Sequence, residues 1–162
     1  MILHHKMDNK NGFYVMKKLS GIWHLFIIFM FSSLAANSQC KHFARQVCKR
    51  ELAPYTHNGN YNAAILTEGE TAEMYKTFYA NQSYRLFICG SNGLPKLHFQ
   101  VLDVNRNVIY DNKNDGYKPK WDFVPETSQQ LIISLKVANG NRKKNTEEPV
   151  SGCVSIMIGI KE

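Results

Sequence analysis

Four cysteines are the residues of this chain whose chemistry is most constrained by type and spacing. They are Cys40, Cys48, Cys89 and Cys153, and the successive intervals are 8, 41 and 64 residues. None of these intervals gives the Cys-x-x-Cys pair of a zinc site. An even number of cysteines in an exported domain instead predicts two disulfides. Cysteines held in disulfides would not be available as catalytic nucleophiles.

A second pattern has the oxygen spacing that opens a calcium loop, at Asp103, Asn105 and Asn107. A helical calcium loop also needs glycine at its sixth position and a bidentate glutamate at its twelfth. Those positions hold Val108 and Asn114. An asparagine-rich hairpin turn explains the same residues, since asparagine tolerates positive φ. We therefore predict no cofactor, with calcium as the alternative.

A third candidate is aromatic. Trp121, with Tyr117 and Tyr110 nearby in the sequence, could form a platform on which a sugar ring stacks. A tryptophan in a strand is more often partly buried in a core, because its large apolar area contributes most there. A carbohydrate-binding module is therefore an alternative function.

A small hydrolase is a second alternative. Catalysis by a nucleophile requires a base within hydrogen-bond reach of an activated serine or cysteine. His42, His57 and His98 are separated by changes of predicted element, and the chain has no Gly-x-Ser-x-Gly elbow. The sequence therefore predicts that the protein is not an enzyme.

The stretch 16–38 has the order of a secretory signal peptide. Met16 and two lysines are followed by the apolar run Leu25–Ala36, and small residues lead to a cut after Ser38. The run is shorter than the roughly 20 residues of a membrane span. We predict an upstream extension at 1–15, a signal peptide at 16–38, and a secreted or periplasmic mature domain at 39–162 without a membrane span.

Charge gives no support for a nucleic-acid partner. The chain carries +7 in total, but residues 1–38 contain four of its 20 basic and one of its 13 acidic residues, which leaves +4 on the mature domain. The densest basic cluster, Arg142–Lys144, is followed at once by Glu147 and Glu148. A run that carries its own counter-charges is typical of a solvated loop.

The elements that must position these side chains begin with a helix predicted over 40–52. Its apolar face comprises Cys40, Phe43, Ala44, Val47, Cys48 and Leu52. Eight helical residues span about 12 Å at about 1.5 Å each, whereas a disulfide joins Cα atoms at most about 7 Å apart. We therefore expect that Cys40 does not pair with Cys48, and that each pairs with Cys89 or Cys153.

After the helix the pattern changes to the period of two that is typical of strands. Between 96 and 103, Leu97, Phe99 and Val101 alternate with polar residues. The other expected strands are 61–67, 72–79, 83–89, 108–110, 120–124, 129–137 and 152–160. About eight short strands at roughly 10-residue spacing, after one short helix, predict an antiparallel jelly-roll-like β-sandwich.

Several of these strands resemble those of the bacterial pre-peptidase C-terminal domain family. The resemblance is carried by the run Leu66–Glu73, by the segment Phe78–Ile88 with its Tyr-Arg pair, by the hairpin Phe99–Tyr110 and by the closing strand Val154–Ile158. The chain also has the style of small secreted Bacteroidetes proteins, in which glutamine often follows the signal cut. The resemblance implies a jelly-roll accessory module of secreted proteins without catalytic residues of its own.

These observations predict a secreted, non-catalytic β-sandwich that serves as a binding or interaction module. Its partner would be a protein or a glycan outside the cytoplasm. The sequence does not identify that ligand.

Overall fold

The computed structural model describes residues 35–140 and 148–161. The elements described below belong to one compact unit that begins at Ala36, apart from Ala35, the first residue of the first helix. The predicted upstream extension, most of the predicted signal peptide and the basic cluster at 142–144 lie outside the described residues. In the part of the chain that is described, no helix is both long enough and apolar enough to cross a bilayer.

Two helical segments begin this unit. They are the α-helix α2, Ala35–Gln46, and the 3-10 helix η1, Cys48–Leu52. The prediction of one continuous helix over 40–52 is therefore wrong at Val47, where the helix type changes. Val47 is also 53% exposed, although the helical period places it on the buried face. Apolar spacing does not distinguish an α-helix from the tighter 3-10 turns that are frequent at its ends.

Nine strands follow in the described residues: β1 Thr56–His57, β2 Asn62–Thr67, β3 Thr71–Phe78, β4 Ser83–Gly90, β5 Leu97–Leu102, β6 Val108–Asp111, β7 Lys120–Phe123, β8 Gln129–Val137 and β9 Ser151–Lys161. A 3-10 helix, η2, covers Asn112–Asp115. The eight predicted strands are all present, with ends that shift by one residue or so. The short strand β1 is additional to them.

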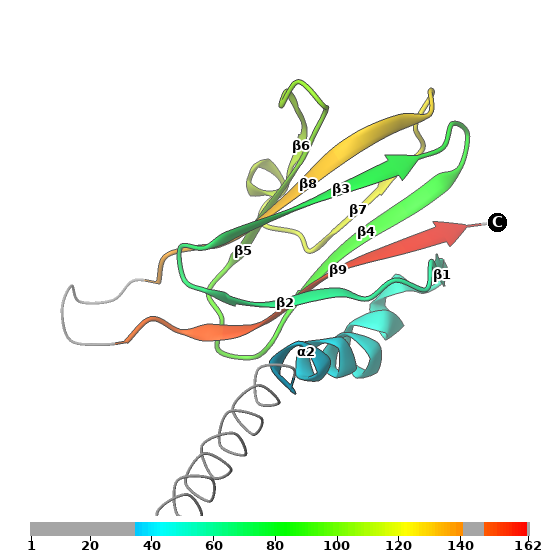
Figure 1. The fold of residues 1–162 in the computed structure, drawn as a ribbon. Coiled ribbons are helices and arrows are strands. Elements are labelled where there is room, and N and C mark those ends of the chain that lie inside the picture. Colours follow the sequence, from blue (N-terminus) through cyan, green and yellow to red (C-terminus); the bar gives the residue numbers. More distant parts are fainter. Residues whose placement is uncertain (1–34, 141–147, 162) are drawn as a thin grey trace, which may run out of the picture. The chain divides into compact units, whose positions relative to one another are not determined.

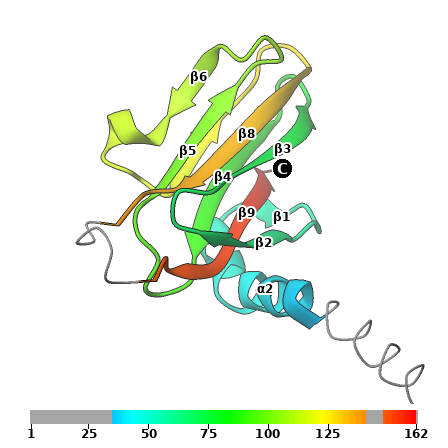
Figure 2. The same ribbon diagram turned by 60° about the vertical axis from the view of Figure 1, so that its left-hand side comes forward.

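The strands form two sheets in which every pairing is antiparallel. Sheet A has the order β1-β9-β4-β7, and β2 also pairs with β9. Sheet B has the order β3-β8-β5-β6. Figures 1 and 2 show the two sheets as the two layers of a sandwich. The predicted antiparallel β-sandwich is confirmed.

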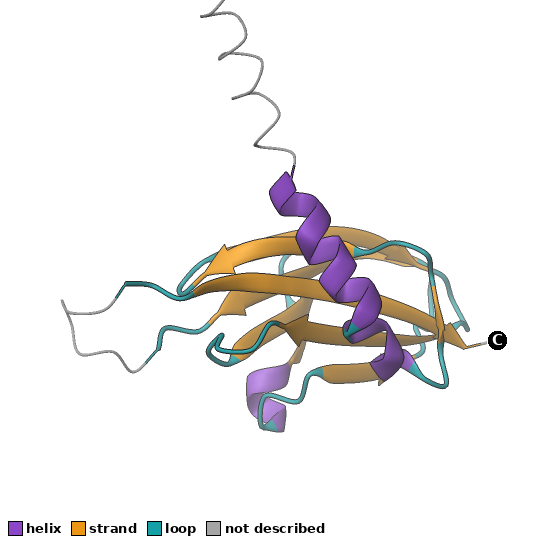
Figure 3. Ribbon diagram, turned by 90° about the horizontal axis from the view of Figure 1, so that it is seen from below, coloured by secondary structure: helices purple, strands orange, loops and turns teal. Residues whose placement is uncertain are grey.

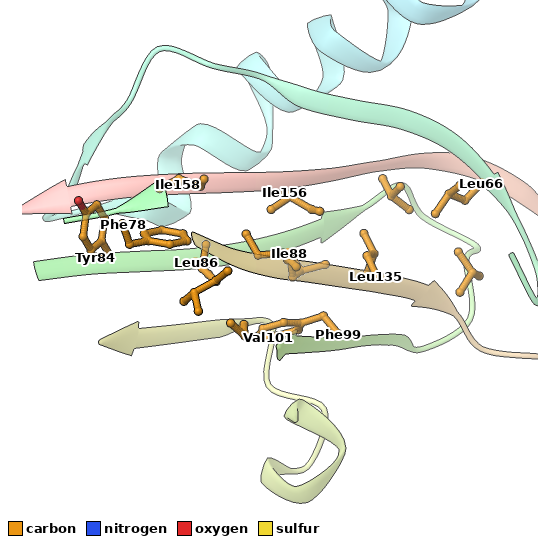
Figure 4. Close-up of a cluster of buried hydrophobic side chains, with 14 residues drawn as sticks. Leu66, Phe78, Tyr84, Leu86, Ile88, Phe99, Val101, Leu135, Ile156 and Ile158 are labelled. Atoms are coloured by element: carbon orange, nitrogen blue, oxygen red, sulfur yellow. The ribbon is translucent and has the colours of Figure 1, made fainter. Parts of the chain in front are cut away.

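The main core lies between the two sheets, where Figure 4 shows side chains from both layers facing one another. Phe78, Phe99 and Ile133 come from sheet B, and Leu86 and Ile158 come from sheet A. All five are almost completely buried. Alternation along the strands selects these residues, because successive side chains of a strand point to opposite faces.

The same alternation separates the two faces of β3. Ala72 and Met74 pack against the core, whereas Tyr75 is 57% exposed on the other face. Sheet B therefore has an inner face in the core and an outer face on which Tyr75 lies.

Candidate functional site

Two disulfides fix the helical segment to the outer face of sheet A. Cys40 is joined to Cys153 of β9, and Cys48 is joined to Cys89 of β4. The Cα atoms of the two pairs are 5.2 Å and 5.8 Å apart. The predicted pair of disulfides is confirmed, and the observed pairing is one of the two arrangements that the sequence left open. None of the four cysteines carries a free thiol.

A small second core forms under this clamp. Ala44, Cys48 and Leu52 from the helical segment pack on Phe87 and Met157 of sheet A. Figure 3 shows α2 lying across the strands of this sheet. The helical segment therefore covers the outer face of sheet A over β4 and β9.

The outer face of sheet B carries a row of apolar side chains across all four strands. The strand registers align Tyr75 of β3 with Ile132 of β8, Ile132 with Leu102 of β5, and Leu102 with Val108 of β6. Ile132 and Leu102 are 2% and 6% exposed, while Tyr75 and Val108 at the two ends are 57% and 54% exposed. We call Tyr75, Ile132, Leu102 and Val108 the Tyr75 row.

An arginine lies across this row. Arg106, in the turn between β5 and β6, forms an ion pair with Glu73 of β3. Because β8 lies between β5 and β3, the arginine side chain must cross the outer side of β8 near Ile132. Its side chain remains 58% exposed. The hydrogen bond and charge of Glu73 raise the pKa of the Arg106 guanidinium, so its positive charge is secure.

A polar cluster borders the Tyr75 row. His98 Nε2 lies 2.8 Å from Asp111 Oδ1, and the Gln100 side-chain amide donates to Asp111 Oδ2 at 2.8 Å. Burial acts to raise the pKa of Asp111, but hydrogen bonds from the Lys113 backbone, His98 and Gln100 outweigh it and lower this pKa. Asp111 is therefore a bound carboxylate that holds the β5–β6 pair together.

The predicted sugar platform is only partly assembled. Trp121 of β7 stacks on Tyr110 of β6, with ring centroids 4.7 Å apart, and on Phe123 at 4.2 Å. Tyr117 instead lies under the ammonium group of Lys96. Trp121 packs against the main core and is half-buried. Packing of β6 in sheet B against β7 in sheet A thus brings two of the three predicted aromatic residues together.

A pocket of about 290 Å³ nevertheless lies beside Trp121. Its lining includes Trp121, Phe123 and Leu131, together with the polar residues Glu126 and Thr127. One part of the indole group therefore reaches a cavity that contains polar groups.

The predicted calcium residues form a closed hairpin turn. Asp103 Oδ1 accepts hydrogen bonds from the backbone N–H groups of Asn105 and Asn107, both at 2.8 Å, and Oδ2 accepts from the Asn107 side chain at 2.7 Å. These bonds, led by the one from the Asn107 side chain, lower the pKa of Asp103. The residue with positive φ is Arg106, at 66°, and neither asparagine has it. The hairpin turn accounts for these contacts, and calcium binding stays the untested alternative to the prediction of no cofactor.

The candidate histidines lie on three different elements. His42 is on α2, His57 is on β1 and His98 is on β5. His57 is held in its own turn, where it contacts the Asn60 carbonyl and accepts from the Gly59 N–H. In the described residues, no three side chains of histidine, cysteine, aspartate or glutamate gather in a way that could hold a metal ion.

Sequence reasoning missed the Tyr75 row. Its members are far apart in the chain, and in β3, β8 and β5 each is a single apolar residue among outward residues that are otherwise polar. Only the registers between β3, β8, β5 and β6 show that these positions align. Apolar residues at outward positions of the predicted strands are the signal in the sequence that points to this row.

Comparisons with known proteins identify no family. No family model matches the chain, and no curated protein matches it. The resemblance to the pre-peptidase C-terminal domain family therefore stays a prediction. Among solved structures, the chain is similar to PliG from Aeromonas hydrophila, a periplasmic inhibitor of g-type lysozyme. The two share 15% identity over 67% of this chain and 89% of PliG, with a TM-score of 0.46.

Proposed function

We propose that this protein is a non-catalytic module that works outside the cytoplasm and binds another protein through the outer face of sheet B. The observation that carries the proposal is the Tyr75 row with Arg106 lying across it. The two disulfides support the location, because such bonds persist in oxidising compartments. The proposal applies equally to a periplasmic and to a fully secreted protein.

The composition of this face is that of a protein interface. Tyrosine and arginine are among the residue types most enriched at positions that dominate binding energy. Protein interfaces commonly have an apolar centre and a polar rim. Here Tyr75 and Arg106 provide these types, the exposed side chain of Val108 adds apolar surface, and the cluster around Asp111 forms the rim. A glycan would instead require an open aromatic face with several hydrogen-bonding groups around it.

The side chains that could carry chemistry are engaged in structural contacts. All four cysteines are in disulfides, and His98 is bonded to Asp111. These contacts support a binding role over a catalytic one.

Site-specific photo-crosslinking tests the proposal. A benzophenone amino acid would replace Val108 on sheet B, and in a matched control it would replace Lys120, which is exposed on β7 of sheet A. In cells that make the protein natively, irradiation should give a discrete adduct with another protein from position 108 and not from position 120. Tyr75→Ser should weaken that adduct. Identical adducts from both positions, or no adduct from position 108, would contradict the proposal.

The pocket beside Trp121 favours one second candidate, a carbohydrate-binding module. Trp121 and Phe123 would supply ring faces, and Glu126 and Thr127 would supply hydrogen bonds. A glycan array checks this alternative. Binding that is lost in Trp121→Ala while the fold persists would support it, and an array without bound glycans would contradict it.

A further inference from the structure

One long strand edge has no partner strand among the described residues. β3 pairs with β8 along all eight of its residues, and it ends sheet B on that side. The preceding strand in the chain, β2, lies in the other layer, and Figure 1 shows β2 and β3 joined by a turn from which they diverge. β2 pairs with β9 and not with β3.

The direction of the backbone groups of β3 follows from one hydrogen bond. The Val137 N–H donates to the Glu70 carbonyl at 3.0 Å, so this carbonyl, which directly precedes β3, points toward β8. Hydrogen-bonded and non-hydrogen-bonded pairs alternate in an antiparallel ladder. The even-numbered residues of β3 therefore bond to β8. The N–H and C=O groups of the odd-numbered residues point to the free edge: Thr71, Glu73, Tyr75 and Thr77.

A pocket lies next to this free edge. It has a volume of about 230 Å³ and is formed between β2 and β3. Its lining includes Ala64 from β2, Ala72 and Met74 from β3, and Leu135 and Ile156 from the main core. The lining is mostly apolar, and its small side chains on β2 and β3 leave space at the side of the sandwich.

We propose that the free edge of β3 binds an extended segment of the partner protein as an added strand, with an apolar side chain of that segment in the pocket between β2 and β3. The proposal rests on the proposed protein-binding function and names the chemical form of the partner. An added strand satisfies the free N–H and C=O groups of the edge, as in other complexes formed by strand addition. Its inward side chains would extend the inner layer of sheet B and lie beside β2, where the pocket is.

A second copy of this chain fits the edge less well. Two β3 strands related by a two-fold axis would pair antiparallel, with odd residues opposite odd residues. An axis at Glu73 places two glutamates opposite each other. An axis at Met74 or at Tyr75 places Lys76, which shares the inward face, opposite Ala72 or Met74 of the pocket lining. Each central register therefore brings together like charges or sets a lysine against the apolar pocket, whereas a partner segment with an apolar residue avoids both.

The experiment uses the disulfide-bonded mature chain and a phage-displayed library of linear peptides. Glu73→Pro removes one N–H of the free edge without removing a bond to β8, and proline is tolerated on edge strands at such positions. Glu73→Val is its matched control, because both variants lose the ion pair with Arg106 and only the proline loses the N–H. Ala72→Leu fills the pocket and leaves the backbone unchanged. Circular dichroism and thermal melting establish that each variant is folded.

We expect selected peptides with apolar residues at alternate positions. Their affinity should fall about tenfold or more in Glu73→Pro and in Ala72→Leu, and by less than about threefold in Glu73→Val. If Glu73→Pro fails to fold, Ala72→Leu alone decides by the same criterion. Peptides that bind all variants equally, or a library that yields no binder, would overturn the proposal. A dimer seen by sedimentation in Glu73→Val and absent in Glu73→Pro would also overturn it, by assigning the edge to a second copy.

These outcomes are separable from the test of the proposed function. Adducts from position 108 that persist in Glu73→Pro would show that the outer face of sheet B binds a protein without an added strand. Loss of the adducts together with loss of peptide binding would support both proposals.

Discussion

Arg85 and Asp122 form a two-point ion pair between adjacent strands of sheet A. The Nε and Nη2 atoms of Arg85 lie 2.7 Å and 2.6 Å from the two carboxylate oxygens of Asp122. The remaining nitrogen, Nη1, donates to the Ala53 carbonyl at 2.6 Å, and the guanidinium lies over the Tyr55 ring. One side chain therefore ties β4 to β7 and to the chain that leaves η1.

Arg85→Lys should destabilise the domain by about 1.5 to 3 kcal/mol, because an ammonium group cannot reproduce the planar fork that serves both partners. The Arg85 side chain is only 11% exposed, so the lost contacts are poorly replaced by water. Urea unfolding followed by circular dichroism measures this change. Lys118→Met is the control, since its ion pair with Asp115 is exposed to solvent and should contribute much less to stability. Equal effects of the two substitutions would contradict the assignment of Arg85 as an anchor.

Stability should decline as the pH falls below about 4, and Asp122 should contribute to the decline. The hydrogen bonds from Arg85 lower the pKa of Asp122 below its ordinary value of 3.8. The unfolded chain then takes up a proton at higher pH than the folded chain does. The stabilisation is complete well above pH 3.8, and it is lost as the pH falls from there through the lowered pKa. Asp122→Asn should flatten this part of a plot of unfolding free energy against pH, and an unchanged slope would contradict the prediction.

The sequence predicts the sandwich well because its signals are local. Alternation between 97 and 101 follows from which face of β5 meets the core, and no knowledge of other strands is needed to see it. The two disulfides were likewise predictable from an even cysteine count, although not their pairing. The Tyr75 row was not predictable, since it depends on the register of β3, β8, β5 and β6. The change of helix type at Val47 also leaves no mark in the apolar spacing.

Asn112 is another residue whose role is hidden in the sequence, because the residues around it are mostly polar. Its side chain is almost completely buried, accepts from the Phe99 N–H at 2.9 Å, and donates to the Leu97 carbonyl at 3.0 Å. Asn112→Ala should destabilise the domain by about 1 to 3 kcal/mol, because a buried donor and a buried acceptor lose their partner. Thermal unfolding compares it with Asn114→Ala, an exposed site in the same 3-10 helix η2. A similar melting temperature for both variants would refute this role.

The two disulfides should contribute unequally. The Cys40–Cys153 bond closes a segment of 113 residues and the Cys48–Cys89 bond one of 41. The chain-entropy relation gives about 4.8 and about 3.9 kcal/mol for loops of these lengths taken singly, and measured values commonly fall below such figures. Replacing both cysteines of a bond by alanine should therefore destabilise the domain by about 2 to 5 kcal/mol, with the larger loss for Cys40 and Cys153. Denaturant titration of the two double variants checks the order, and the reverse order would contradict the loop-length account.

Trp121 is the one tryptophan of the predicted mature domain, because Trp23, the other tryptophan of the chain, precedes the predicted cut. In the mature domain the fluorescence therefore reports on one side chain, stacked between β6 and β7 partners. Trp121→Ala should cost about 2 to 4 kcal/mol, since it removes a half-buried indole and its stacking on Tyr110 and Phe123. Trp121→Phe keeps a ring in the stack and should cost less than half as much. Equal losses in the two variants, measured by urea unfolding followed by circular dichroism, would show that ring stacking does not hold this edge of the sandwich together.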